Sequence, residues 1–352
     1  MTQSTDSAPL CVLVDVTHPA HVHLFRHAVN ALEARGHDVH VAAREKDVTT
    51  DLLDALGHEY AVCSATRDGP LALPREWVWR ELTLYRYARR VDPDVVLSHL
   101  NPAAAHVAAA VGAESVVFHD TEIADAVERY TLPFVDTVCT PLEFSRDLPG
   151  EHVRYAGFHE LAYLHPARFE PDPDALREAG VDPGSPYSVV RLVSMDAHHD
   201  TGADGFPREA VRRLVDGLAD HGDVYLSTEG ALPAEFADHD LPVDSHELLD
   251  LLAFADCYVG DSGTVATEAG VLGTPAVRYD PLDADLGNFD ALADYGLVAS
   301  TTDPEAAVDR ALELAGDPNA GRRWARRRRD LLADKVDVTA FVVALTEEVT
   351  TA

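Results

Sequence analysis

Apolar and polar residues follow two alternating patterns along the first part of the chain. Short Val-rich runs, each about the length of one buried strand, are separated by longer segments with the spacing of amphipathic helices. Gly36 and Gly57 follow the first two helical segments, where glycine commonly ends a helix. Strands are expected at 11–16, 37–43, 59–63, 94–99 and 114–119, and helices at 20–35, 47–56, 74–90 and 101–111.

The alternation of strand and helix segments is interrupted at 157–185, where Pro and Gly are frequent. A second series of strand and helix segments follows. Two successive strand–helix series predict an α/β protein with two Rossmann-like, doubly wound lobes and an interdomain cleft for the ligand. The second series has expected strands at 187–193, 223–227, 256–261 and 275–279, and helices at 206–220, 246–254 and 264–272. The expected parts are a tail at 1–9, an N-terminal lobe at 10–157, a connection at 158–185, a C-terminal lobe at 186–335 and a last helix at 336–352 that packs on the first lobe.

The chain is strongly acidic, with 61 Asp and Glu against 28 Lys and Arg and a formal net charge of −33. Apolar content is ordinary at 46%, so the charge indicates an acidified surface and not disorder. Together with the scarcity of Lys, it favours an intracellular protein of a salt-loving microbe. Nucleic acid is excluded as a partner, because phosphate binding requires a basic footprint.

The other compositional signals are weak. The four Cys stand singly in or beside apolar runs and are expected to be buried thiols. Residues 1–9 lack the apolar core of a signal peptide, and no apolar run approaches the length of a membrane span. We therefore expect a cytoplasmic protein, with at most peripheral contact with the inner face of the cell membrane.

The segment 255–279 carries the most informative motif. The expected strand 256–261 leads through Ser262 and Gly263 directly into a helix. This arrangement directs backbone N–H groups and the positive helix end at one point, which suits a diphosphate, and Gly263 lets the backbone approach closely. Glu268, one turn further on, then receives ribose hydroxyls. An ordinary strand-to-helix turn capped by Ser262 or Thr264 explains the motif equally well.

Ser262-Gly263-Thr264, Glu268 and the Leu-Gly-x-Pro that follows resemble the nucleotide-binding segment of non-hydrolysing UDP-N-acetylglucosamine 2-epimerases and GT-B glycosyltransferases. The stretches DVTHPAHVHLFR, AREKDVTTDLL, FHDTEIA and YAGFHELAYLHP are similar to the prokaryotic family called domain of unknown function 354, over about residues 10–300. That family resembles GT-B enzymes, which implies an acceptor in the N-terminal lobe and a nucleotide sugar in the C-terminal lobe. Ser262, Gly263 and Thr264 would hold the UDP diphosphate, and Glu268 the ribose.

The loop THPAHVH occupies the place where those glycosyltransferases have a Gly-rich turn ending in histidine. The resemblance therefore implies that His21 is the catalytic base, with His18 beside it, and histidine suits proton transfer near neutral pH. A metal site among His18, His21, His23 and His27 is the alternative. The side chains of His21 and His23 should point in different directions on a helix, and the sequence places no Asp, Glu or Cys ligand close to them. We therefore expect no metal and no other cofactor.

Other strand ends carry candidate groups. FHDTEIAD follows the strand at 114–119, so Asp120 and Glu122 lie at the sheet edge where α/β proteins bind ligands. Either they act on an acceptor hydroxyl, or Asp120 or Thr121 simply caps the next helix. In the second lobe Arg191 either neutralises phosphate or forms a buried ion pair. The expected nucleotide-sugar residues at these strand ends are Arg191, Ser194, His198, His199 and Glu229.

Segment 67–90 combines six Arg with only three acidic residues, and Trp77, Trp79, Tyr85 and Tyr87 lie between them. Such a helix suits an anionic bilayer surface or a lipid-phosphate acceptor. Its periodicity favours the alternative that the aromatic stripe packs on the sheet.

The leading hypothesis is a metal-independent hexosyltransferase of the GT-B type, which transfers a sugar from a UDP-sugar in cell-surface glycan, glycolipid or glycoprotein biosynthesis. A polyprenyl-phosphate-linked molecule is the expected acceptor. A UDP-N-acetylglucosamine 2-epimerase-like enzyme and a non-catalytic nucleotide-sugar-binding protein are the alternatives.

Overall fold

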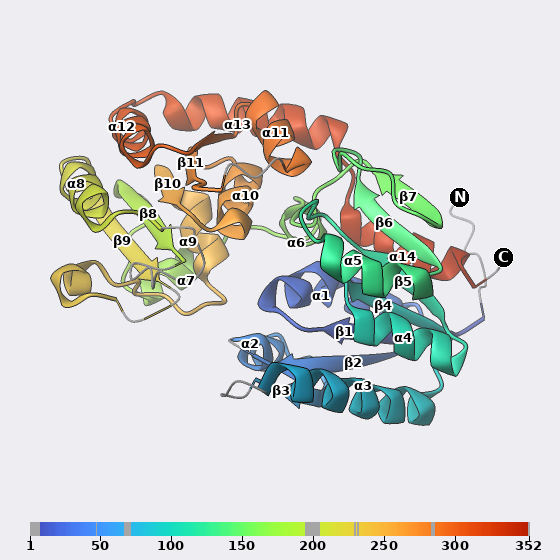
Figure 1. The fold of residues 1–352 in the computed structure, drawn as a ribbon. Helices are drawn as coiled ribbons and strands as arrows, with labels where there is room; N and C mark the ends of the chain where they lie inside the picture. The colour runs from blue at the N-terminus through green and yellow to red at the C-terminus, as the bar shows by residue number, and fades with distance from the viewer. Residues whose placement is uncertain are drawn as a thin grey trace. The chain divides into compact units, whose positions relative to one another are not determined.

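The computed structural model describes residues 8–46, 48–66, 72–193, 205–228, 230, 232–282 and 286–350 (Figure 1). The chain divides into two compact units, the first formed by residues 1–168 and 336–352 and the second by residues 169–335. Each unit is built on one parallel β-sheet. The predicted fold class, two Rossmann-like α/β lobes in succession, is confirmed.

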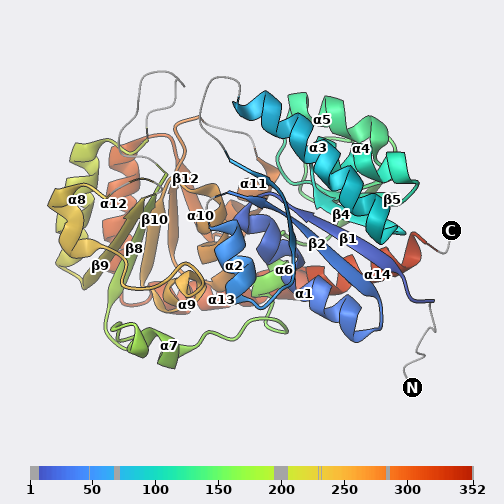
Figure 2. The same ribbon diagram turned by 90° about the horizontal axis from the view of Figure 1, so that it is seen from below.

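The first unit has a seven-stranded sheet in the order β3-β2-β1-β4-β5-β6-β7. Helices α3, α4 and α5 cover one face, and α1, α2, α6 and α14 cover the other (Figure 2). Its strands are β1 (Cys11–Val16), β2 (Asp38–Glu45), β3 (Ala61–Ala65), β4 (Val95–His99), β5 (Glu114–Phe118), β6 (Thr137–Pro141) and β7 (Glu151–Tyr155). Its helices are α1 (Pro19–Ala34), α2 (Thr49–Ala55), α3 (Ala72–Val91), α4 (Pro102–Val111), α5 (Asp125–Thr131), α6 (Leu161–Leu164) and α14 (Val338–Glu348), with a 3-10 turn η1 (Leu132–Phe134).

The second unit has a five-stranded sheet in the order β12-β11-β10-β8-β9. Helix α8 packs with α12, and α10 packs with α9, α11 and α13. Its strands are β8 (Tyr187–Leu192), β9 (Asp223–Thr228), β10 (Cys257–Gly260), β11 (Ala276–Tyr279) and β12 (Val298–Thr301). Its helices are α7 (Pro173–Glu178), α8 (Arg208–Ala219), α9 (Leu248–Phe254), α10 (Gly263–Leu272), α11 (Gly287–Asp294), α12 (Pro304–Ala315) and α13 (Ala320–Asp334), with a 3-10 turn η2 (Ala234–His239).

Every strand expected from the sequence is present, but β6, β7 and β12 were not predicted. These strands are four or five residues long, and β7 (Glu151-His-Val-Arg-Tyr155) carries three polar side chains. β7 pairs along its whole length with β6. Backbone hydrogen bonds to β6, and not an apolar side-chain pattern, therefore define β7 as a strand. Cys63, Cys139 and Cys257 are buried as expected, whereas Cys11 is partly exposed.

Each sheet has one topological switch point, where neighbouring strands lead to connections on opposite sides. In the first unit it lies between β1 and β4, and in the second between β8 and β10. Ligands of doubly wound sheets bind outside the carboxyl ends of the strands at such points. The strand order thus selects the loops after β1, β4, β8 and β10 as candidate sites.

A buried carboxylate joins three elements at the first switch point. Asp15 of β1 is only 1% exposed and accepts hydrogen bonds from Arg80 of α3 and from Nδ2 of Asn101. Asn101 is also the N-cap of α4, because its Oδ1 accepts the Ala103 N–H at 3.0 Å. The loop after β1 and the loop after β4 are therefore held in a fixed relation.

The tryptophans of helix α3 do not pack on the sheet, contrary to what its sequence pattern had predicted. Leu84 and Ala88 fill its sheet side, whereas Trp77 is 58% and Trp79 is 57% exposed. The prediction that the aromatic stripe packs on the sheet is therefore wrong for both tryptophans, because the sheet side is already occupied by aliphatic side chains. Among the described helices, none is long and apolar enough to cross a membrane.

Candidate functional site

Four polar side chains from separate segments meet at the carboxyl edge of the first sheet. His99 is the last residue of β4, Asp120 follows β5, and His159 lies in the turn between β7 and α6. Asp120 Oδ1 lies 3.3 Å from His99 Nε2, and Asp120 Oδ2 lies 3.0 Å from His159 Nδ1. The ring of His21, in the first turn of α1, stacks on His99 with 4.5 Å between centroids and 21° between planes. These residues form the histidine array.

The charge of Asp120 is set by the two imidazoles. Burial opposes ionisation of its carboxyl group, but His159 and His99 outweigh this effect and hold its pKa well below the ordinary value. Thr121 Oγ1 donates a further hydrogen bond to Oδ1 at 3.1 Å. Neither Asp120 nor Thr121 caps α5, whose N-cap is Ala124 and has no side-chain cap. The capping interpretation is therefore wrong for both residues.

His21 is held neutral in this environment. Burial lowers its pKa well below 6.5, the neighbouring His99, His18 and His159 lower it further, and only Asp120 opposes them. Its Nδ1 lies 3.2 Å from Thr17 Oγ1 and accepts the Thr17 N–H at 3.4 Å. The tautomer that accepts this N–H carries its proton on Nε2. In the other tautomer, Nδ1 donates to the Thr17 hydroxyl oxygen, and only then does Nε2 carry a lone pair that can accept a proton.

The other histidines of the opening loop make contacts of their own. His18 is the N-cap of α1, and its Nδ1 accepts the Ala20 N–H at 3.2 Å. Its ring lies beside that of His21, with 5.9 Å between centroids, as expected. His23 stacks on Tyr163 with 4.9 Å between centroids. In the described part of the chain, His23 Nδ1 and His27 Nε2 are buried without a hydrogen-bond partner. The sequence cluster is therefore not one set, and His21 alone joins the histidine array.

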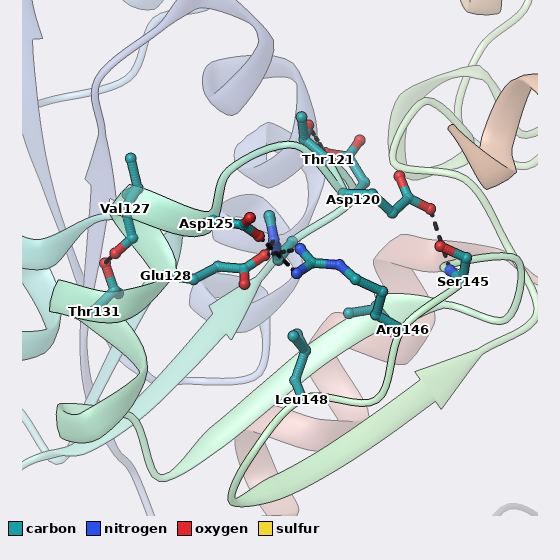
Figure 3. A network of polar contacts seen from close by, with 12 residues as sticks. Asp120, Thr121, Asp125, Val127, Glu128, Thr131, Ser145, Arg146 and Leu148 are labelled. Carbon is teal, nitrogen blue, oxygen red and sulfur yellow. Dashed lines mark hydrogen bonds and ion pairs between the residues drawn. The ribbon is translucent and has the colours of Figure 1, made fainter. Parts of the chain in front are cut away.

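Glu122 has a partner outside the histidine array. It is buried, and its Oε1 accepts the N–H of Ser145 at 3.2 Å. Figure 3 shows the network that surrounds this loop, in which Arg146 lies between Asp125 and Glu128. Glu122 therefore holds the loop after β6, and the structure supplies a positioning contact for a residue that the sequence assigned to catalysis.

Two groups of side chains among the described residues have the spacing for a metal ion. One is His99, Asp120 and His159, whose ligand atoms all lie within 4.8 Å of one another, and the other is Cys11, Asp38 and His40. Burial raises the pKa of the Cys11 thiol to about 11, so this thiol is protonated in the metal-free protein. Neither group contains the histidines at 18, 21, 23 and 27 for which the sequence raised the metal question.

The second switch point lies where β8 and β10 end. Asp261 Oδ1 accepts the Val193 N–H at 2.6 Å, which ties the two strand ends together. Gly260 is required for this approach, because a Cβ there would lie 2.2 Å from the Arg191 carbonyl oxygen. Arg191 Nη1 donates to Ser227 Oγ at 3.1 Å and to the Thr228 carbonyl at 3.5 Å. Its hydrogen bonds to the described residues thus go to neutral oxygens and not to a buried carboxylate.

The start of α10 has the features of an anion site. Ser262 occupies the N-cap position but makes no side-chain cap, and the first turn holds no acidic residue. The first N–H groups of a helix lack intrahelical partners, so they remain for a ligand. A Cβ on Gly263 would make only ordinary contact with Phe289, at 3.5 Å, so internal packing does not demand glycine there. Thr264 is exposed, and Glu268 is buried at 5% exposure.

Four of the residues expected to bind the nucleotide sugar lie outside the described residues. These are Ser194, His198, His199 and Glu229.

Sequence reasoning missed His99 and His159. His99 is the last residue of a predicted strand. Polar residues at the carboxyl ends of strands are candidates for ligand binding, and the same rule had identified Asp120 after β5. Applied to the strand at 94–99, it would have identified His99 as well. His159 had no such signal. Its place is fixed by the turn after β7, a strand that the sequence pattern did not predict.

Comparisons with known proteins agree with this architecture. The model of a family described as "Protein of unknown function (DUF354)" matches residues 10–342. The uncharacterized protein MJ0665 of Methanocaldococcus jannaschii is 22% identical over 292 residues, which cover 77% of this chain and 82% of that protein.

Solved structures with the same two-lobed fold belong to two kinds of enzyme. Spinosyn forosaminyltransferase SpnP has a TM-score of 0.63 at 17% identity, covering 98% of this chain and 100% of its own. The UDP-GlcNAc 2-epimerase from Neisseria meningitidis, bound to UDP-GlcNAc, has a TM-score of 0.68 at 12% identity, covering 96% and 99%. At these identities the likeness shows the fold that glycosyltransferases and epimerases share.

Two partly buried histidines of α1, His23 and His27, make the stability of the protein depend on pH. Burial, aided by Arg26, lowers the pKa of His23 to about 3 and that of His27 to about 4. Because the unfolded chain takes up these protons near pH 6.5, stability is complete above about pH 7 and is lost as the pH falls toward 4, by about 1.4 kcal/mol per pH unit for each group.

Urea unfolding at two pH values tests this. A variant with both His23→Gln and His27→Gln should lose less stability between about pH 8 and pH 5 than the parent, because two proton-binding groups are gone from the unfolded chain. Comparing the difference between the two pH values within each protein removes the cost of altered packing. Equal differences in parent and variant would contradict the pKa assignment.

Proposed function

Since the chain belongs to the DUF354 family of proteins of unknown function, we propose its function from the site itself: it is a glycosyltransferase that uses a nucleotide sugar, in the first instance a UDP-sugar. The observation that carries this proposal is the histidine array at the first switch point, where His21, His99, Asp120 and His159 come together. The likeness of the fold to glycosyltransferases supports it.

The first unit would bind the acceptor and activate its hydroxyl group. His21 Nε2 takes the proton of the acceptor O–H while the oxygen forms a bond to C1 of the sugar. The bond between C1 and the UDP oxygen breaks at the same time, and UDP leaves with the electron pair, so the sugar configuration inverts. The ionised Asp120, two contacts away through His99, stabilises the imidazolium that forms on His21.

The second unit would bind the donor. The uncapped N–H groups at the start of α10, around Ser262, Gly263 and Thr264, suit the diphosphate, and Glu268 suits the ribose. Arg191 at the end of β8 supplies positive charge for the leaving UDP. Helix N–H groups and Arg191 together neutralise the departing charge, so the reaction requires no metal and no other cofactor.

The acceptor side of the proposal is a lipid-linked molecule. A polyprenyl phosphate carrying a sugar fits the exposed tryptophans of α3 and the arginines beside them. The chain would then act from the cytoplasmic side of the cell membrane, in peripheral contact with it, during synthesis of a cell-surface glycan, glycolipid or glycoprotein.

An epimerase-like enzyme is the second candidate. The histidine array provides several groups able to move protons, and epimerisation at the sugar C2 requires acid and base groups on both faces of that carbon. The likeness of the fold to a UDP-GlcNAc 2-epimerase supports this candidate equally. A nucleotide-sugar-binding protein without catalysis leaves the array of histidines without a role.

The role of His21 can be measured directly. His21→Ala should reduce turnover by at least about 100-fold, because the acceptor proton loses its base, while UDP binding by the second unit persists. His40→Ala, a partly exposed histidine of β2 in the same unit, is the matched control and should leave turnover unchanged. A metal chelator should have no effect. Turnover that survives in His21→Ala, or that is lost with chelator and restored by zinc, would contradict the mechanism.

Substitution of Gly263 at the start of α10 should weaken UDP binding without changing the stability of the protein. Gly263→Ala should unfold at the same urea concentration as the parent, because the new methyl group finds room beside Phe289, yet should weaken UDP binding by about tenfold or more. Gly321→Ala, where a Cβ meets nothing within 4 Å, is the control for both measurements. Calorimetric UDP affinities that are unchanged in Gly263→Ala, Ser262→Ala and Glu268→Ala would show that the nucleotide binds elsewhere.

A further inference from the structure

The exposed side of α3 has an unusual composition for this protein. From residue 75 to residue 91, nine side chains of the helix are exposed, and each is Arg, aromatic or aliphatic. We call these nine residues the α3 face: Arg75, Trp77, Val78, Trp79, Leu82, Tyr85, Arg86, Arg89 and Arg90. The two acidic residues of the helix, Glu76 and Glu81, are not among them.

The charge of the α3 face is opposite to that of the chain. The protein carries a formal charge of −33, yet this surface presents four arginines. Glu76 is buried and binds Arg44, at 2.6 and 2.8 Å, and the buried Arg80 binds Asp15. Glu81 beside the α3 face has a side chain that is 46% exposed, and its Oε1 lies 2.8 Å from His106 Nδ1. One partly exposed carboxylate thus stands against four exposed arginines.

Apolar exposure continues beside the α3 face on the same side of the sheet, where α3, α4 and α5 lie next to one another (Figure 2). Ile123 and Tyr130 are each 63% exposed, and Phe134 of η1 is 46% exposed. Nine of the fifteen large apolar side chains found exposed among the described residues lie between 77 and 85 or between 123 and 134. This concentration exceeds the scattered single residues that ordinary surfaces carry.

A cavity beside this surface extends to Thr17, the neighbour of the proposed base. It has a volume of about 340 Å³ and lies between α3 and α4, with Trp77 and Tyr130 among its walls. Glu76, Arg80 and Glu81 also line it. Thr17, whose hydroxyl group contacts His21 Nδ1, is part of the wall, whereas His21 itself is not.

We propose that the α3 face binds the surface of an anionic lipid bilayer, with the cavity beside it holding the apolar part of a lipid. Trp and Tyr combine an apolar body with a polar tip, and Arg places its stem in apolar surroundings while its charge contacts phosphate. A helix that exposes such residues with a surplus of Arg over acids suits the interface of a membrane with anionic headgroups. A lipid in the cavity would bring its polar end to Thr17, which contacts His21, and this last step rests on the proposed function.

Vesicle binding tests the proposal. The parent should sediment with vesicles of phosphatidylcholine and phosphatidylglycerol and much less with phosphatidylcholine alone. The double variant Trp79→Ser, Leu82→Ser should lose about tenfold or more of this binding, and Arg86→Glu with Arg89→Glu should lose it as well. The controls are Leu142→Ser and Arg322→Glu, exposed residues of other elements, which should bind as the parent does.

Several outcomes would overturn the proposal. One is a parent that does not bind anionic vesicles, and another is α3 variants that bind as well as the controls do. A parent that forms dimers which the α3 variants abolish, without vesicle binding, would show that the face is an interface between copies of this chain. The assay contains no nucleotide sugar, so it succeeds or fails independently of the transfer reaction. Urea unfolding of the α3 variants at the same concentration as the parent shows that they are folded.

Discussion

The candidate site of the first unit depends on one partly buried carboxylate placed between two imidazoles. Asp120 follows β5 and contacts His99 at the end of β4 and His159 after β7, so a single side chain fixes three chain segments that are distant in sequence. His21 joins them by stacking on His99. Because the two imidazoles outweigh the effect of burial, the carboxylate stays ionised, and this charge orients the rings around it.

Both units use the same physical arrangement at their switch points. In the first, the carboxylate of Asp15 fixes α3 and α4 relative to β1, and Asp120 gathers the histidines at the strand ends. In the second, Asp261 ties the end of β8 to the end of β10, directly before the uncapped start of α10. The histidine array therefore lies in one unit and the uncapped helix start in the other, and the function we propose assigns proton transfer to the first and nucleotide binding to the second.

The fold was predictable because its central strands read as continuous apolar runs and its helices as amphipathic ones. The strands β6, β7 and β12 were not predicted because they are short and carry polar residues. Their backbone hydrogen bonds to neighbouring strands define them, and not their side-chain pattern. Asp120 was found because it follows a strand, and His159 was missed because its turn follows a strand that had no visible pattern. The exposure of Trp77 and Trp79 was not predictable, since aliphatic residues of the same helix occupy its sheet side.

The proton NMR spectrum of a UDP-sugar incubated with the protein in D₂O distinguishes sugar transfer from epimerisation. Without an acceptor, we expect the sugar signals to persist and no deuterium to enter at C2. When a lipid carrying a polyprenyl-phosphate-linked sugar is added, UDP should appear and the anomeric signal of the donor should decline. Deuterium at C2, or conversion to the C2 epimer without acceptor, would contradict the transferase assignment.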